Sequence, residues 1–162
     1  MIPTINVTKL FRTLSILLLA ANTVGLGSGQ QAEVGPLTGG CTLHIHITGL
    51  RNQKGHIAGA LFKTKAGWPE DRSKVFREDA YPFTGSTATL TFEHVPPGKY
   101  GVAVIHDENA NDKLDRNFFG IPIEGFGFAN NPRVVWRAPE FEDSLVKVTC
   151  PVTETTIRMI YM

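Results

Sequence analysis

The sequence predicts an all-β protein: an antiparallel two-sheet sandwich, immunoglobulin-like or prealbumin-like, with about seven strands and one long ordered loop. Three observations predict it. After residue 40, apolar side chains recur at every second position, which is the period of a half-buried strand. Prolines, glycines and asparagines separate these runs at short intervals, and the period of a helix is almost absent. An up-and-down barrel is the alternative.

The first expected strand covers residues 42–48, where polar and apolar residues alternate. Its inward-facing residues are Leu43, Ile45 and Ile47. This alternation is typical of an antiparallel strand that tolerates a sheet edge. The next run, residues 56–63, is apolar on both faces. We therefore expect it deeper in a sheet and paired with the first strand, with Gly59 allowing close approach.

The rest of the chain continues the same pattern. A polar connector covers residues 64–75, where Pro69 before two acidic residues predicts one short helical turn. A turn at residues 96–98, Pro-Pro-Gly, leads into a strand. The remaining strands are expected at residues 87–92, 100–106, 144–150 and 155–161.

The sequence predicts two parts of the chain. Residues 1–32 are a signal peptide with a short leader, and residues 41–162 are the sandwich domain. The leader has two basic residues and no acidic one before an apolar run over residues 14–21, and small residues precede a cleavage site near Ala32. A membrane anchor is the alternative. Spanning a bilayer takes about 20 predominantly apolar residues, however, and here Asn22 and the glycines that follow it interrupt the apolar run too early. We therefore expect export to the periplasm, the cell surface or the medium.

The charge balance implies no polyanionic partner. The chain has 16 Lys and Arg and 15 Asp and Glu. Two of the basic residues lie in the leader, so the mature domain is close to neutral. Basic and aromatic residues are not interleaved on any strand, as nucleic-acid stacking would require. We expect an unknown protein or an envelope component as partner, no nucleic acid, and no membrane span in the mature form.

The two cysteines, Cys41 and Cys150, are expected to form a disulfide. Cys41 lies on the face of Leu43, and Cys150 lies on the face of Val146 and Val148, so strand alternation points both sulfurs into one core. An oxidising compartment permits the bond. Two buried free thiols are the alternative.

Residues 106–117 are rich enough in acids and amides to suggest an ion site, and calcium is the candidate ion, although no cofactor is required by the sequence. The first, third, fifth, seventh and ninth places of a calcium-loop pattern are taken by Asp107, Asn109, Asn111, the carbonyl of Lys113 and Asp115. Asp112 replaces the usual glycine, and Phe118 replaces the bidentate acid. Glu124 comes too late for that place unless the chain folds back. Asx turns that order the loop without metal explain the same residues.

Residues 118–131 continue this long loop. Its four aromatic residues are Phe118, Phe119, Phe126 and Phe128. They either pin the loop to the core, the favoured interpretation, or line a groove. The residues expected at the loop surface are His106, Glu124, Asn130 and Asn131.

Two further sets of side chains could carry chemistry. His44 and His46 on one strand face, with His106 ending another, could bind a transition metal, but a solvated strand face explains them better. His106, Asp107 and Glu124 could supply the acid and base of a hydrolase-like enzyme, yet no nucleophile elbow and no phosphate loop accompany them. A non-enzymatic binding or structural module is therefore the favoured function, and the hydrolase is the alternative.

Four segments together resemble the bacterial domain-of-unknown-function family 2141. These are Gly55 to Phe62 (GHIAGALF), Pro97 to Asn109 (PGKYGVAVIHDEN), Gly120 to Asn131 (GIPIEGFGFANN), and Pro139 with Phe141. The resemblance implies an exported β-sandwich-like domain without an assigned activity, and it carries over no catalytic residue. The family's loop more often has glycine where this chain has Asp112, which weakens the case for tight ion binding.

Overall fold

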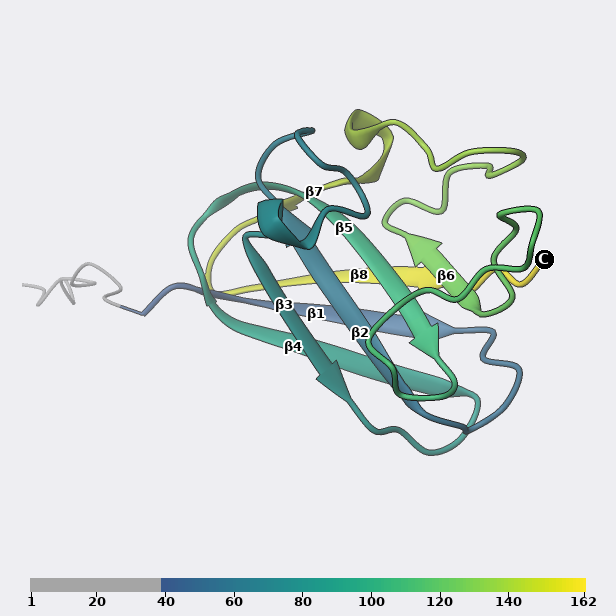
Figure 1. Ribbon diagram of the computed structural model, residues 1–162. Coiled ribbons are helices and arrows are strands. Elements are labelled where there is room, and N and C mark those ends of the chain that lie inside the picture. Colours follow the sequence, from purple (N-terminus) through teal and green to yellow (C-terminus); the bar gives the residue numbers. More distant parts are fainter. Residues whose placement is uncertain (1–38) are drawn as a thin grey trace, which may run out of the picture. The chain divides into compact units, whose positions relative to one another are not determined.

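Eight strands build the part of the chain that the computed structural model describes, residues 39–162 (Figure 1). The strands are β1 Cys41–Thr48, β2 His56–Phe62, β3 Arg77–Tyr81, β4 Thr87–Val95, β5 Gly98–Asp107, β6 Gly125–Phe128, β7 Leu145–Val148 and β8 Val152–Arg158. They form two sheets, and residues 39–162 contain no α-helix. The predicted all-β, two-sheet fold is confirmed, with eight strands where about seven were expected. The predicted signal peptide lies outside the described residues.

The three-stranded sheet has the order β4-β1-β8. Strand β1 pairs antiparallel with β4 and parallel with β8, so the strand that was expected to tolerate an edge is the central one. The expected pairing of residues 56–63 with the first strand is also wrong, because β4 and β8 occupy the two sides of β1 and β2 pairs with β3 and β5 in the other sheet. The β1–β8 pair is the single parallel pairing between these strands.

The five-stranded sheet has the order β3-β2-β5-β6, and β7 also pairs with β5. Strands β2 and β5 are interior, which agrees with the apolar residues on both of their faces. Two strands of this sheet were not predicted. Strand β3 was overlooked because its residues are largely polar, and β6 lies inside the segment interpreted as loop.

The helical turn of the connector lies later than expected. A 3-10 turn covers Arg72–Lys74, and its N-cap is Asp71, whose side chain accepts a hydrogen bond from the backbone N–H of Ser73 at 3.0 Å. Pro69, the expected helix start, belongs to the preceding turn, in which the Gly67 carbonyl accepts hydrogen bonds from Glu70 and Asp71.

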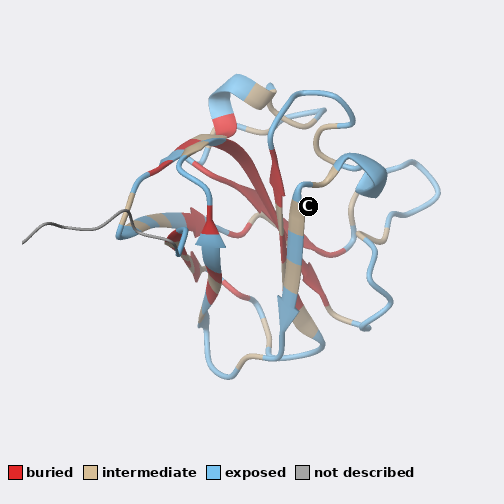
Figure 2. Cartoon of the chain, turned by 90° about the vertical axis from the view of Figure 1, so that its left-hand side faces the viewer, coloured by how far each residue is buried: buried red, intermediate tan, exposed pale blue. Residues whose placement is uncertain are grey.

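The core lies between the two sheets, where buried residues follow the inner strand faces (Figure 2). The predicted inward residues Leu43, Ile45 and Ile47 are fully buried there. The predicted disulfide is confirmed: Cys41 and Cys150 are bonded, and the bond joins the start of β1 to the turn between β7 and β8. Among the described residues, no helix is long and apolar enough to cross a bilayer.

Candidate functional site

The outer face of the five-stranded sheet, which faces away from the core, is largely apolar. Strand register places two rows of side chains across four strands of this face. One row is Ala80, Ala58, Ile105 and Phe126, and the next is Glu78, Ala60, Ala103 and Phe128. An antiparallel sheet face that is exposed to water is normally polar. This apolar composition therefore marks a face that binds or is covered.

A hollow of about 1280 Å³ lies over these two rows, and we call it the outer groove. The alanines of its floor leave room above the sheet, and segments 69–75, 112–122 and 134–138 form its walls. The apolar wall residues are Pro69, Leu114, Phe119, Ile121, Val134 and Trp136. The outer groove therefore has a floor formed by the sheet and walls formed by three loop segments.

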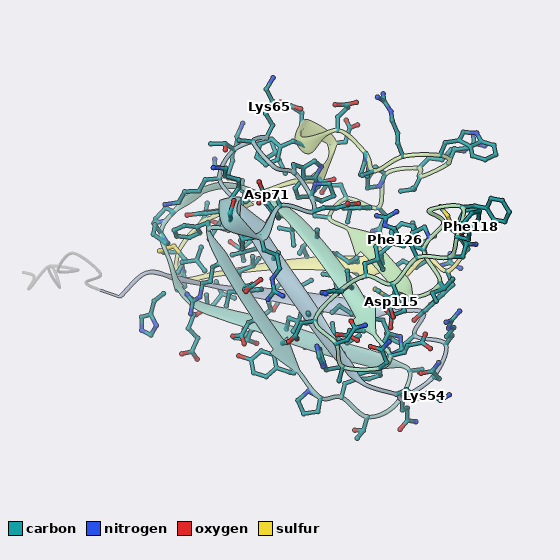
Figure 3. The ribbon with its side chains drawn as sticks, viewed as in Figure 1. Lys54, Lys65, Asp71, Asp115, Phe118 and Phe126 are labelled. Carbon is teal, nitrogen blue, oxygen red and sulfur yellow. A yellow bond between two sulfur atoms is a disulfide. The ribbon has the colours of Figure 1, made fainter. Side chains whose placement is uncertain are left out.

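The four phenylalanines of the long loop divide into two pairs. Phe126 and Phe128 are buried in β6, but on the outer face of the sheet and not in the core between the sheets, whereas Phe118 and Phe119 are 98% and 82% exposed. In Figure 3, Phe118 projects from its loop away from the strands, while Phe126 lies at the sheet. Pinning is therefore wrong for Phe118 and Phe119, and Phe119 instead lines the outer groove.

A tight turn explains why these two rings stay outside. The side-chain oxygen of Asn117 accepts hydrogen bonds from the backbone N–H groups of Phe119 at 2.9 Å and Ile121 at 3.0 Å. Gly120 adopts a φ of 76°, which a residue without Cβ tolerates. The turn lifts the loop tip from the sheet, and sequence periodicity does not report such a local side-chain bond.

The Asp/Asn-rich loop is ordered by its own hydrogen bonds. The buried carboxylate of Asp107 accepts from the N–H groups of Asn111 at 3.2 Å and Asp112 at 2.6 Å. Asn109 and Asn111 each accept from the N–H two residues ahead, as in Asx turns. Both asparagines also donate their amides to Asp115. The predicted ion-binding side chains are thus brought together, and their polar atoms bond to one another.

Two details of the calcium-loop pattern depend on the folded backbone. Asp112, at the place of the usual glycine, has a φ of 61°, so it adopts the left-handed conformation itself. Glu124 folds back onto the loop. Its carboxylate accepts from the N–H groups of Glu108 at 2.8 Å and Asp115 at 3.0 Å. Glu124 therefore bridges the beginning and the end of the loop.

The three side chains of the hydrolase alternative do not share one surface. His106 is fully buried on the core side of β5, next to Tyr161, whereas Asp107 follows it on the strand and faces the outer side. The Nε2 of His106 lies 2.8 Å from the Lys54 carbonyl. Because a carbonyl only accepts, Nε2 carries the proton and Nδ1 accepts from the Tyr161 hydroxyl at 2.8 Å.

The four residues expected at the loop surface differ in their exposure. Asn130 and Asn131 are exposed, whereas His106 and Glu124 are buried, so the expectation is wrong for the latter two. Asn130 donates its amide to the carbonyls of Asp143 and Leu145, and Asn131 donates to the carbonyl of Thr156. These two asparagines tie the end of β6 to β7 and β8.

The three histidines of the possible transition-metal set, His44, His46 and His106, do not lie together. His44 and His46 lie on the outer face of the three-stranded sheet, where their Nδ1 atoms are 3.0 and 3.3 Å from the hydroxyls of Thr91 and Thr89. His106 lies inside the core. A different histidine, His56, stands beside Asp107, because β2 and β5 pair these two residues. Sequence reasoning missed His56 because it placed β2 beside β1.

Arg51 and Glu108 connect the Asp/Asn-rich loop to Tyr161, near the C-terminus. The Nε of Arg51 donates to Glu108 at 2.7 Å, another guanidinium nitrogen donates to the Ile123 carbonyl at 2.8 Å, and the guanidinium lies 4.6 Å from the Tyr161 ring centre. Burial alone would raise the pKa of Glu108, but hydrogen bonds from Arg51 and Asn52 outweigh it and hold the pKa below its ordinary value of 4.5.

This lowered pKa predicts a loss of stability in acid. An acid whose pKa is lower in the folded state stabilises the fold above its unfolded pKa, and this contribution disappears as pH falls through the folded pKa. We expect the free energy of unfolding to fall less steeply below about pH 4.5 in Glu108→Gln than in the unmodified protein. Urea unfolding between pH 3 and 6 measures this slope. Equal slopes would show that Glu108 does not contribute.

Comparison with known proteins gives one match. The model of a family described as "Uncharacterized protein conserved in bacteria (DUF2141)" matches residues 45–156, which run from β1 into β8. No curated protein and no solved structure matches the chain.

Proposed function

This chain belongs to the DUF2141 family of bacterial proteins, and from the outer groove we propose that it is a non-enzymatic binding module for a hydrocarbon chain of an envelope component. The observation that carries the proposal is the groove's apolar floor, two rows of side chains on an otherwise solvent-facing sheet. The module acts after export, in the periplasm or at the cell surface. The disulfide supports an oxidising compartment.

The shape of the groove favours a long apolar ligand. Its floor crosses four strands, from β3 to β6, and three interstrand steps span about 14 Å. Each methylene group that is removed from water there contributes about 0.8 kcal/mol. A chain of many methylene groups can therefore gain affinity along the whole floor.

Charges at the rim favour a neutral rather than an ionic contact. Arg72 lies 2.8 Å from Glu78, and Arg137 lies 3.0 Å from Glu140. Arg116 pairs with Glu70. Because these guanidinium groups already have acidic partners, they do not favour an anionic ligand over the apolar chain.

The Asp/Asn-rich loop serves this function as a groove wall. Leu114 and Ile121, which lie within or just after it, line the groove, and the internal hydrogen bonds of the loop hold them in place. Calcium binding by Asp107, Asn109, Asn111, Lys113 and Asp115 stays a separate hypothesis. The side-chain amides of Asn109 and Asn111 donate hydrogen bonds to the Asp115 carboxylate, and these hydrogen bonds compete with calcium for that carboxylate. The hydrolase alternative gains no support, since His106 faces the core.

Tryptophan fluorescence tests the proposal directly, because both tryptophans of the chain lie beside the groove. Trp136 lines it and is 93% exposed, and Trp68 packs 5.7 Å from Phe128. We expect palmitate and 1-hexadecanol to shift the emission to shorter wavelength by burying Trp136, whereas butyrate does not. Ala60→Leu adds bulk to the groove floor and should weaken binding at least about tenfold, or about 1.4 kcal/mol.

Thr89→Leu is the matched control, because it adds a similar side chain to an exposed position of the other sheet. It should bind palmitate as the unmodified protein does. The proposal is wrong if neither 16-carbon probe changes the emission, or if Ala60→Leu and Thr89→Leu have equal affinity. Comparing palmitate with the uncharged alcohol separates recognition of the chain from recognition of its head group.

A further inference from the structure

A cluster of three potential metal ligands lies at one end of the outer face, one row beyond Ala58. The Nε2 of His56 is 3.3 Å from a carboxylate oxygen of Asp107 and 3.4 Å from one of Asp112. The three ligand atoms all lie within 4.8 Å of one another. The residues come from β2, β5 and the following loop, and the pairing of His56 with Asp107 brings them together.

The Nε2 atom of His56 has no hydrogen-bond partner. The Nε2 of His56 is buried and makes no hydrogen bond, although two carboxylates lie near it. Buried polar atoms are nearly always paired, so an unpaired one calls for an explanation. A metal ion bound to the Nε2 lone pair would supply the missing partner.

From this geometry we propose that His56, Asp107 and Asp112 bind a zinc ion. Zinc bonds to nitrogen and oxygen are about 2.0–2.2 Å long, and tetrahedral geometry then places neighbouring ligand atoms about 3.3–3.6 Å apart. The two measured distances, 3.3 and 3.4 Å, match two edges of such a tetrahedron. The side chain of Asp112 is 64% exposed, so the fourth position can take a water molecule.

The surrounding structure orients these ligands. The carboxylate of Asp107 is held by the N–H groups of Asn111 and Asp112, which is the outer-shell support that metal ligands usually have. The imidazole and the small number of ligands favour zinc over calcium, which takes six to eight oxygen atoms. This site is independent of the hydrocarbon proposal, although Asp112 also lines the outer groove.

The test uses the tag-free mature protein with zinc and with cobalt as a spectroscopic substitute. We expect one equivalent of zinc to bind and raise the Tm, and cobalt to give the strong visible absorption of a tetrahedral site. Asp112→Asn changes a side chain that is 64% exposed, so we expect this variant to keep the fold. Asp112→Asn and His56→Gln should weaken binding by more than the roughly 10- to 100-fold that loss of an outer-shell partner costs.

His46→Gln is the control, because His46 also lies near a single acid, Glu154, at 3.7 Å, but on the other sheet. It should bind zinc with unchanged affinity. Equal affinity of the unmodified protein, Asp112→Asn and His56→Gln would overturn the proposal, and so would the absence of a tetrahedral cobalt spectrum. Circular dichroism checks that His56→Gln is folded. Palmitate binding by His56→Gln, whose changed residue does not line the outer groove, separates a failure of this site from a failure of the groove.

Discussion

Replacing both cysteines, as Cys41→Ala with Cys150→Ala, is expected to lower the free energy of unfolding by about 4–5 kcal/mol. The disulfide joins residues 109 positions apart, so it closes nearly the whole domain into one loop. In the chain-entropy account, such a bond restricts the unfolded chain more strongly as the loop grows. Because small domains are stable by about 5–15 kcal/mol, this loss is a large part of the total.

Urea unfolding of the double variant and of the unmodified protein, with and without reductant, measures this effect. Reductant should bring the unmodified protein to the stability of the double variant and leave the double variant unchanged. The m-value should rise without the bond, because the unfolded chain then exposes more surface. A difference below about 1 kcal/mol would show that the bond does not act through loop closure.

Glu124→Ala is expected to lower the free energy of unfolding by about 2–4 kcal/mol. Glu124 is only 4% exposed, and its carboxylate accepts from the N–H groups of Glu108 and Asp115. Removing it leaves two N–H groups without their acceptor at the two ends of the Asp/Asn-rich loop. Glu124→Gln keeps one accepting oxygen and should therefore lie between the alanine variant and the unmodified protein.

Hydrogen exchange locates this effect. The amides of Glu108 and Asp115 should exchange faster in Glu124→Ala, while those of β1 and β4 exchange through global unfolding alone. Glu154→Ala is the matched control, because Glu154 is exposed and should change stability by less than about 0.5 kcal/mol. If both variants are equally stable, the bridge formed by Glu124 contributes nothing to the fold.

Strand β6 shows where sequence reasoning failed and why. Its sequence, Gly-Phe-Gly-Phe, alternates with the period of a strand, yet glycine is rare in strands, and the segment was interpreted as loop. In the fold, a Cβ at Gly125 would lie 2.5 Å from Tyr161, and one at Gly127 would lie 2.5 Å from Ile157. Glycine is required because β8 and the chain end pack closely against this strand, which only the tertiary structure reveals.

The sequence by itself determined the fold class, the inward face of β1, and the disulfide, because strand alternation assigns each side chain to a face from local order alone. It also indicated that residues 56–63 lie deep in a sheet. The tertiary structure alone decided which strands pair. That pairing made β1 central, set the two alanine-rich rows side by side, and brought His56 to Asp107. Alternation says which face a residue takes but not which strand lies next to it, because pairing depends on contacts between residues far apart in the chain.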